Sequence, residues 1–351
     1  MPGTQDDDAP RGVPTLHDVA RLAGVSIKTV SEVVNRTGRV AAATAARVES
    51  AIASIGYQPN LSARRLRTGR TGVVGLAVPE LSLSGYFNEL SAAVVRIAAE
   101  RGLTVLIEQT GGTREGELRA LRGPRRSVMD GLLINAVALD EQDVQDLGPL
   151  GPTVVLGERR LGPQLDHVTF GNEEAARLVT EHLLGLGRRH ILVLTGDPAV
   201  SASAARRLAG HHQALAAAGL APAAGLVRVV AVWDHAAGYR HVVEAHRGGP
   251  SFDAVLAVND SLALGALRAL HDLGVDVPGT VAVAGIDDVV DARFSHPRLT
   301  TVDPHRDVLA ELAVRTLTER IADRRRPGAV HEIEAHLRVR GSTLASAEPP
   351  G

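Results

Sequence analysis

From Thr71 onward, short runs of apolar residues alternate with stretches that have the apolar spacing of amphipathic helices. The runs are nearly continuous in apolar character, which is typical of parallel strands covered by helices on both faces. Two sets of about five such units predict two doubly wound subdomains, an α/β fold. The predicted strands are residues 73–78, 104–108, 131–134, 153–156, 190–194, 226–230, 254–257 and 281–285, and the predicted helices include 88–101, 175–185 and 260–273.

The composition and the motif content limit the kinds of site that this chain can hold. Cysteine is absent, which excludes disulfides, zinc–thiolate sites and a thiol nucleophile. No GxGxxG, GxxxxGK[ST], GxSxG or HExxH string occurs, and His331 and His336 have the wrong spacing for a helical zinc pair. We therefore predict no catalytic residue, no metal site and no cofactor, and the chain is not expected to be an enzyme.

Neither a membrane span nor a secretory signal is visible in the sequence. No apolar run reaches the roughly 20 residues that a membrane helix needs, and the acidic start MPGTQDDDAP lacks the basic, apolar and small-residue pattern of a leader. A cytoplasmic protein is the simplest interpretation. Residues 1–14 and the tail ASAEPPG have the composition of disordered segments.

The segment 15–70 is basic, with nine Lys and Arg residues against three acids, whereas the net charge of the whole chain is -2. A small basic segment on a mildly acidic body is typical of a module that binds a polyanion, although a solvated basic surface has the same composition. The run Arg324-Arg325-Arg326 is interpreted as a solvated helix end.

The pattern of residues 15–55 predicts a helix-turn-helix followed by a third helix. Thr15 and Asp18 have the spacing of a capping box at the start of the first helix. Gly24 ends that helix, and Ser26 can cap the second. Two short helices joined by a tight glycine turn form a helix-turn-helix, and the third helix is expected over residues 43–55.

The second helix of such a module enters the major groove with its N-terminal side chains against base edges. Lys28 can donate to guanine, Ile27 can contact a thymine methyl, and Glu32 can accept from cytosine. Short polar side chains suit phosphate oxygens, and here they are Thr29, Ser31 and Asn35. An ordinary helical hairpin with a solvated face fits the composition equally well.

The exact residues favour DNA binding, because the strings TLHDVARLAGVS, KTVS, VVN and GYQPNLSARRLRTGRTGVVG closely resemble the headpiece of the lactose repressor (LacI–GalR) family. The resemblance implies a helix-turn-helix domain over 15–58 and a hinge helix and linker over 59–70. In that family the hinge helices insert apolar side chains into the minor groove and bend the duplex. The DNA-binding residues implied are Thr15, Ser26, Ile27, Lys28, Thr29, Ser31, Glu32, Asn35, Tyr57, Asn60, Ala63 and Leu66.

Two headpiece positions depart from the common pattern of the family. Glu32 stands where an arginine is frequent, so the operator is expected to differ at the position that this residue reads. Ala41 stands where a serine often caps the third helix. Losing such a cap costs about 1 kcal/mol, so this headpiece is expected to be marginally stable without DNA.

The resemblance continues through the body in the strings YFNEL, MDGLLI, RRLAGHHQAL, AVNDSLALGALRAL, VPGTVAVAGIDD and HPRLTTV. It implies a two-lobed effector domain over 71–345 that is similar to periplasmic sugar-binding proteins, with three crossovers near Gly171, Asp303 and His331. On that mapping the N-lobe comprises about 72–170 and 304–331, and the C-lobe about 171–303 and 332–345. The cleft between the lobes is the expected pocket.

The family pattern assigns pocket roles to individual residues of this chain. Arg207 matches an arginine that donates to effector oxygens, Asp287 a carboxylate that accepts from hydroxyls, and Trp233 a ring that stacks on the ligand. Each has a plainer interpretation: an ion pair, a helix cap and a core residue. The implied effector-binding residues are Tyr86, Phe87, Ser203, Arg207, Trp233, Asn259 and Asp287.

The resemblance implies a homodimeric transcriptional regulator, most simply a repressor, that binds a pseudo-palindromic operator and is controlled by a small-molecule effector. A carbohydrate is the default effector. Gly157 replaces a frequent aspartate, and Asp303-Pro304-His305 replaces a frequent Gln-Pro, so the effector's identity stays open. A sugar-binding protein without a regulatory role is the alternative, but it predicts a leader and no headpiece. Neither the operator sequence nor whether the effector releases DNA or promotes its binding follows from the sequence.

Overall fold

The computed structural model divides the chain into two units, Met1–Thr71 and Gly72–Gly351. The structure describes residues 14–34, 38–57, 70–81 and 85–344. Most of the predicted hinge and linker, and with it Asn60, Ala63 and Leu66, therefore lies outside the described residues, as do Asn35 and both terminal tails.

The first unit is a three-helix headpiece built on α1 (Leu16–Ala23), α2 (Ile27–Val34) and α3 (Ala42–Ile55). The capping box predicted at Thr15 and Asp18 is confirmed, and Gly24 ends α1 in the left-handed conformation that glycine adopts without strain. The backbone N–H of Thr29 donates to Ser26 Oγ, so Ser26 caps α2. A small core closes the unit, and it contains Val19, Ala20, Ala23, Val30, Val48, Ala51 and Tyr57.

The start of α3 lacks a side-chain cap, because Ala41 at the N-cap makes no side-chain hydrogen bond. We expect Ala41→Ser to stabilise the headpiece by about 1 kcal/mol, which corresponds to roughly fivefold slower hydrogen exchange of the α3 amides. Ala43→Ser is the matched control, since Ala43 is exposed inside the first turn and cannot cap. Exchange that slows equally in both variants, or in neither, would show that the missing cap does not limit stability.

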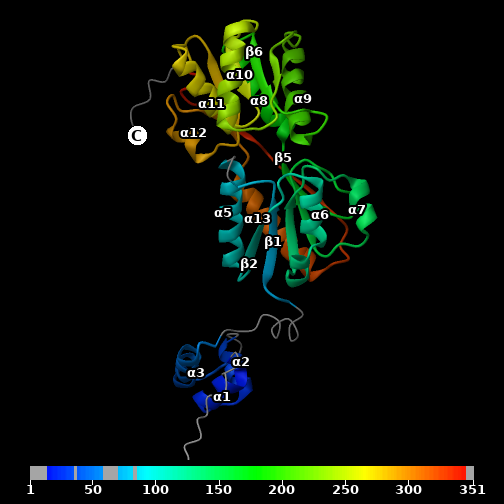
Figure 1. Cartoon of the computed structure of the whole chain (residues 1–351), viewed down its shortest axis with the longest axis vertical. Helices are drawn as coiled ribbons and strands as arrows, with labels where there is room; N and C mark the ends of the chain where they lie inside the picture. The colour runs from blue at the N-terminus through cyan, green and yellow to red at the C-terminus, as the bar shows by residue number, and fades with distance from the viewer. Residues whose placement is uncertain (1–13, 35–37, 58–69, 82–84, 345–351) are drawn as a thin grey trace, which may run out of the picture. The chain divides into compact units, whose positions relative to one another are not determined.

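The second unit contains two six-stranded sheets, each of which forms the centre of a lobe (Figure 1). The first lobe has the order β11-β5-β4-β3-β1-β2 and the second the order β12-β10-β9-β8-β6-β7. The first sheet comprises β1 (Val73–Val78), β2 (Thr104–Gln109), β3 (Gly131–Asn135), β4 (Thr153–Leu156), β5 (Asp166–Phe170) and β11 (Val330–Ile333). The second comprises β6 (Ile191–Thr195), β7 (Val227–Val229), β8 (Ala254–Ala257), β9 (Ala282–Ile286), β10 (Thr300–Asp303) and β12 (His336–Arg338).

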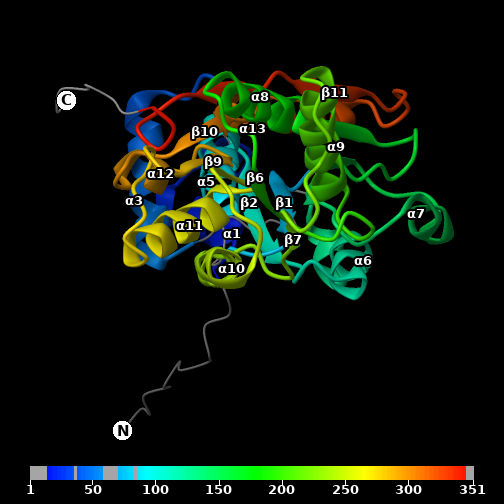
Figure 2. The same cartoon turned by 90° about the horizontal axis from the view of Figure 1, so that it is seen from above.

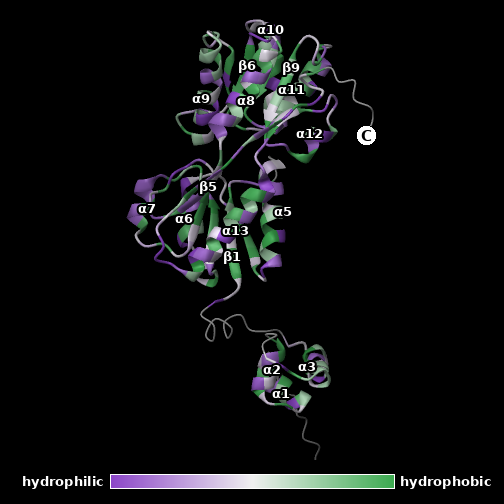
Figure 3. Cartoon of the chain, turned by 180° about the vertical axis from the view of Figure 1, so that it is seen from behind, coloured by the Kyte–Doolittle hydropathy of each residue, from purple (hydrophilic) through white to green (hydrophobic). Residues whose placement is uncertain are grey.

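Helices cover both faces of each sheet because successive strand residues point to opposite sides and both sides are apolar. In the first lobe, Leu76 and Leu133 pack on the side of α5 and α13, whereas Ala77 and Leu132 pack on the side of α6 and α7. Figure 3 shows the strands of both lobes as hydrophobic. The helices of this unit are α5 (Gly85–Glu100), α6 (Arg114–Arg122), α7 (Glu141–Leu147), α8 (Asn172–Gly185), α9 (Ala202–Ala217), α10 (His235–Gly248), α11 (Asp260–Asp272), α12 (Val290–Phe294) and α13 (Arg306–Ala322), together with the 3-10 helix η1 (Pro124–Val128).

In the second lobe the helices form two pairs, one on each face of the sheet. The helices α8 and α9 contact each other, as do α10 and α11, and the two pairs lie on opposite faces (Figure 2). This arrangement places the start of α9 and the start of α11 at the carboxyl ends of the strands, where doubly wound folds bind ligands. The prediction of a helical headpiece and two parallel-sheet lobes is confirmed.

The structure also corrects the prediction in three details. Strand β5 was not predicted, and the predicted strand ranges given above do not include β10, β11 and β12. One of them, β12, runs antiparallel to β10, so the second sheet is not wholly parallel. Strand β11 still pairs with β5 at Ile333, which puts the third crossover at residues 334–335 instead of near His331. The other two crossovers follow Phe170 and Asp303, at the ends of β5 and β10.

Candidate effector site and DNA-binding surface

Arg207 is the centre of a buried polar cluster at the carboxyl ends of the second sheet. It lies one and a half turns into α9 and is 6% exposed. Its Nε donates to Asn172 Oδ1 at 2.6 Å, and its Nη1 donates to the carbonyl of Val258. Its Nη2 lies 3.6 Å from Asp287 Oδ1, and the guanidinium lies over the ring of Phe170, 5.6 Å from the centroid.

Two buried carboxyl groups belong to this cluster, and burial disfavours the charged form of both. The pKa of Asp287 is raised to about 6 by burial, against the opposing charges of Arg207 and Arg306. The pKa of Asp260 is raised to about 8 by burial and by the nearby charge of Asp287. Titratable groups with shifted pKa values at the ends of strands are a feature of functional sites.

The first lobe contacts this cluster through Arg306 and Glu89. Arg306 donates to the carbonyl of Asp287 and, at 2.8 Å, to the carbonyl of Asp288. Its Nη2 lies 2.7 Å from Glu89 Oε2, and Glu89 Oε1 accepts from the backbone N–H of Val290 at 2.8 Å. The loop that carries Asp287 is therefore held by residues of both lobes.

A second polar connection runs from the first lobe to Arg207. Glu158 follows β4, and its Oε1 accepts from Asn172 Nδ2 at 2.8 Å, while Asn172 Oδ1 accepts from Arg207. The residue before it, Gly157, has φ +89, a conformation that favours glycine. Its missing Cβ would lie 3.2 Å from Asn135 Nδ2. Glu158 thus places a carboxylate directly after Gly157, within reach of Asn172.

Three of the predicted effector residues make internal contacts. Asn259 is the N-cap of α11, and its Oδ1 accepts from Leu262 N–H while its Nδ2 donates to the carbonyl of Trp233. The Trp233 ring lies against Gly196, where an added Cβ would come within 2.6 Å of it. The Ser203 hydroxyl lies 3.1 Å from that of Ser201, which caps α9.

Tyr86 and Phe87 open α5 and lie beside the cluster. Their rings are 5.3 Å apart, and Tyr86 is 6.4 Å from the ring of Phe170. Tyr86 packs against the cores of both lobes. Burial and the charge of Asp287 raise the pKa of its hydroxyl. The structure thus brings the predicted residues Tyr86, Arg207 and Asp287 together and adds several that were not predicted: Glu89, Phe170, Asn172, Asp260 and Arg306.

The raised pKa of Asp260 leads us to expect that the free energy of unfolding falls as the pH rises. In the unfolded chain this carboxyl titrates near 3.8 and in the folded chain near 8. Between those values the native state holds a proton that the unfolded state has lost, so raising the pH favours unfolding. We expect the wild type to lose at least about 1.4 kcal/mol relative to Asp260→Asn between pH 5 and pH 8, the equivalent of one pKa unit.

Urea unfolding at the two pH values measures this difference. Asp291→Asn is the control, because Asp291 is an exposed aspartate close to the same loop. A pH dependence shared by wild type and Asp260→Asn would mean that Asp260 is ionised in the folded state.

The exposed side of α2 carries the predicted base-reading residues. Ile27 is 40% exposed, and Lys28 is exposed. Glu32 is half-buried, with its side chain against Gly38. Tyr57, in contrast, is 8% exposed and packs in the headpiece core, so it contributes little to the headpiece surface.

No group of three or more His, Cys, Asp or Glu residues that could hold a metal ion occurs among the described residues. None of the described helices is long and apolar enough to cross a membrane. The cleft between the lobes remains a prediction, because the cavity found among the described residues is lined by residues of the first lobe alone.

A helix-turn-helix joined in one chain to a two-lobed body with a buried polar cluster defines a ligand-controlled DNA-binding regulator. Family models agree with this class. Residues 15–60 match "Bacterial regulatory proteins, lacI family", and residues 180–343 match "Periplasmic binding protein-like domain". The HTH-type transcriptional regulator GalR of Escherichia coli K12 is 36% identical over 289 residues, which is 82% of this chain and 83% of GalR.

Solved structures give the same result over almost the whole chain. The lac repressor dimer bound to operator and the anti-inducer ONPF is 31% identical with a TM-score of 0.81, covering 95% of this chain and 100% of that one. The complex of the regulator CelR with cellobiose is 30% identical with a TM-score of 0.67, covering 94% and 99%. The chain belongs to the LacI family of transcriptional regulators, and it is a repressor-type regulator and not an enzyme.

Proposed function

We propose that the chain is a homodimeric repressor whose affinity for a pseudo-palindromic operator is set by a sugar bound at the Arg207–Asp287 cluster. The observation that carries the proposal is the buried Arg207–Asp287 pair, because both lobes hold it in place. A ligand that binds to this pair would therefore act directly on the hydrogen bonds that connect the two lobes.

The chemistry of the cluster suits a polyhydroxylated ligand. A guanidinium fork donates in one plane to two oxygens, and a carboxylate beside it accepts from hydroxyls. Trp233 is the single tryptophan in the chain, and its half-buried ring can pack on the C–H face of a sugar. The complex of the related CelR with cellobiose supports a carbohydrate as the ligand class.

The contacts between the lobes suggest how binding reaches the DNA. A sugar hydroxyl that pairs with Asp287 competes with Arg207 and shifts the loop whose carbonyls accept from Arg306. The angle between the lobes then changes, because the ligand binds one arrangement better than the other. In a dimer this change alters the spacing of the two headpieces.

The first lobe supplies a surface that supports the proposed dimer. Strand β2 is the edge strand of its sheet, so one side of its backbone is unpaired within the described chain. Leu106 and Ile107 on β2 are 40% and 41% exposed. Apolar side chains on an open edge strand are a liability that natural proteins cover, and a second copy of the chain would cover them here.

The headpiece supports operator binding through α2, and the family pattern adds Leu66 as the minor-groove wedge. Leu66→Ala is the test of this part. The change should weaken operator binding and leave the response of Trp233 to the effector intact. Equal loss of both would assign a structural role to Leu66.

Intrinsic fluorescence tests the effector site directly, because Trp233 reports its own surroundings. Purified full-length protein is titrated with monosaccharides, disaccharides and purines. A saturable change with one sugar, lost in Arg207→Met and kept in Arg206→Met, supports the proposal. Silence across the panel with folded protein, or a response that survives Arg207→Met, contradicts it.

A further inference from the structure

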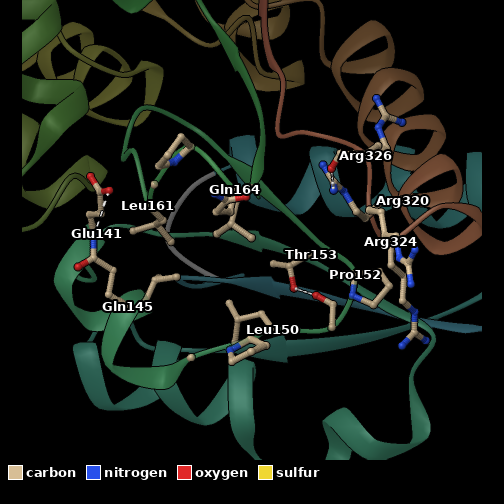
Figure 4. A pocket seen from close by; sticks show the side chains of 18 residues that line it. Glu141, Gln145, Leu150, Pro152, Thr153, Leu161, Gln164, Arg320, Arg324 and Arg326 are labelled. Atoms are coloured by element: carbon tan, nitrogen blue, oxygen red, sulfur yellow. Dashed lines mark hydrogen bonds between the residues drawn. The ribbon is translucent and has the colours of Figure 1, made fainter.

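A cavity of about 730 Å³ lies in the first lobe and shares no residue with the Arg207 cluster. Three segments form its walls: α7 with the loop after it, the loop 161–165, and the end of α13 with the residues that follow it. Figure 4 shows Arg320, Arg324 and Arg326 on one side of the cavity, across from Glu141 and Gln145. Its volume is within the roughly 300–1,000 Å³ typical of small-molecule sites.

The arginine wall carries positive charge that the described protein does not neutralise. Arg320 pairs with the buried Asp166, and Arg326 pairs with Glu319. The side chains of Arg324 and Arg325 make no ion pair or hydrogen bond within the ranges that the structure describes. The backbone N–H of Arg325 donates to Asp323 Oδ1 at 3.0 Å. The helix α13 ends at Ala322, so both follow the helix and are exposed. The predicted solvated helix end thus forms a rim of the cavity.

A fifth arginine shows the effect of this charge. Arg126 lies behind the cavity wall, where its Nη2 donates to the carbonyl of Pro152 at 3.0 Å. Burial and the nearby positive charge of Arg324 lower the pKa of Arg126. Like charges that approach each other repel, and the opposing charge of Asp130 offsets the effect of Arg324 only in part. A bound anion would relieve the remaining repulsion.

The remaining walls supply contacts for the body of a ligand. Leu161 is buried, and Leu150 and Leu165 are partly buried, so one side is apolar. The side-chain amide of Gln164 has no partner among the described residues and can donate or accept. Arginine side chains form stronger hydrogen bonds with the charged oxygens of a phosphate group than with a neutral ligand.

We propose that this cavity binds a phosphorylated small molecule, with its phosphate held by Arg324 and Arg325 and its body against Leu150 and Leu161. A phosphate ester fits better than a free inorganic ion, because the ion alone would leave the apolar side in contact with water. Nucleotides and sugar phosphates share this chemistry, and the experiment separates them.

Isothermal titration calorimetry of the full-length protein with ADP, ribose 5-phosphate and inorganic phosphate tests the site. The variant R324Q/R325Q removes two exposed charges and is expected to fold. The control R240Q/R315Q removes the same charge from two exposed arginines outside the cavity. We expect one organic phosphate to bind more tightly than inorganic phosphate, with an affinity that falls at least about tenfold in R324Q/R325Q and about twofold or less in the control.

Three results would overturn the site: no saturable binding of any of the probes, equal binding by R324Q/R325Q, or equal loss in both double variants. If no phosphate binds but R324Q/R325Q weakens operator binding, these arginines contact DNA. Arg207→Met separates this site from the sugar site, because it should leave phosphate binding unchanged.

Discussion

Replacing Arg207 by methionine is expected to abolish the fluorescence response to the effector and to lower the free energy of unfolding by about 3 kcal/mol. The arginine and its partner Asp287 are each 6% exposed. Without the guanidinium, the Asp287 carboxylate has no counter-ion on its own lobe, and Asn172 Oδ1 and the carbonyl of Val258 lose their donor. Methionine keeps most of the side-chain volume, so the loss measures the polar contacts.

Arg206→Met is the matched control, because the neighbouring Arg206 is an exposed arginine on the same helix. Its side chain is 60% exposed and pairs with Glu173 at the surface. Exposed pairs of this kind contribute about 0–1 kcal/mol. Urea denaturation followed by circular dichroism measures both variants. Similar losses for the two would show that Arg207 is held by packing alone and would remove the basis for the proposed site.

Asp166→Asn is expected to destabilise the first lobe by about 3 kcal/mol, because Asp166 forms a buried ion pair with Arg320. Asp166 is fully buried, and its Oδ2 accepts from Arg320 Nε at 2.8 Å while its Oδ1 accepts from Ala329 N–H at 3.0 Å. Asparagine leaves the Arg320 guanidinium buried without a counter-ion. Asp166 connects β5 to α13 through Arg320 and to the residue before β11 through Ala329. The substitution should therefore destabilise these three elements together.

Asp307→Asn provides the comparison, since Asp307 pairs with Arg96 while 78% exposed. We expect a change of less than about 1 kcal/mol for this variant. Hydrogen exchange locates the effect of Asp166→Asn: protection should fall in β5 and β11 before it falls in the second lobe. Uniform loss over both lobes would mean that they unfold as a single unit.

The strands predicted correctly are those in which nearly every residue is apolar, such as β1, β4 and β8. Strand β5 was missed because Asp166, His167 and Thr169 interrupt its apolar pattern. These polar residues are buried, and Asp166 is stabilised there by Arg320, more than 150 residues later in the chain. The sequence pattern around Asp166 gives no sign of Arg320, so it could not predict that an aspartate would be buried in this strand.

The same limit applies to the candidate site. Arg207 and Asp287 were predicted because family motifs surround them, but Arg306 and Asn172 lie at the crossovers between lobes, where no motif marks them. Asn259 shows the opposite case. Its position at a strand end predicted a ligand contact, yet its side chain caps α11. The sequence defines which residues end strands, while the tertiary contacts decide which of their polar atoms are already used.

The affinity of the full-length protein for operator DNA, with and without the sugar that changes Trp233 fluorescence, tests the central claim most directly. Fluorescence anisotropy on the DNA upstream of the gene measures it, at about 50 and 200 mM salt to separate phosphate-driven binding. We predict that the sugar changes the operator Kd at least about tenfold, a coupling of roughly 1.4 kcal/mol, and that Arg207→Met abolishes this change. A sugar that saturates the site yet leaves the operator Kd unaltered would contradict the account.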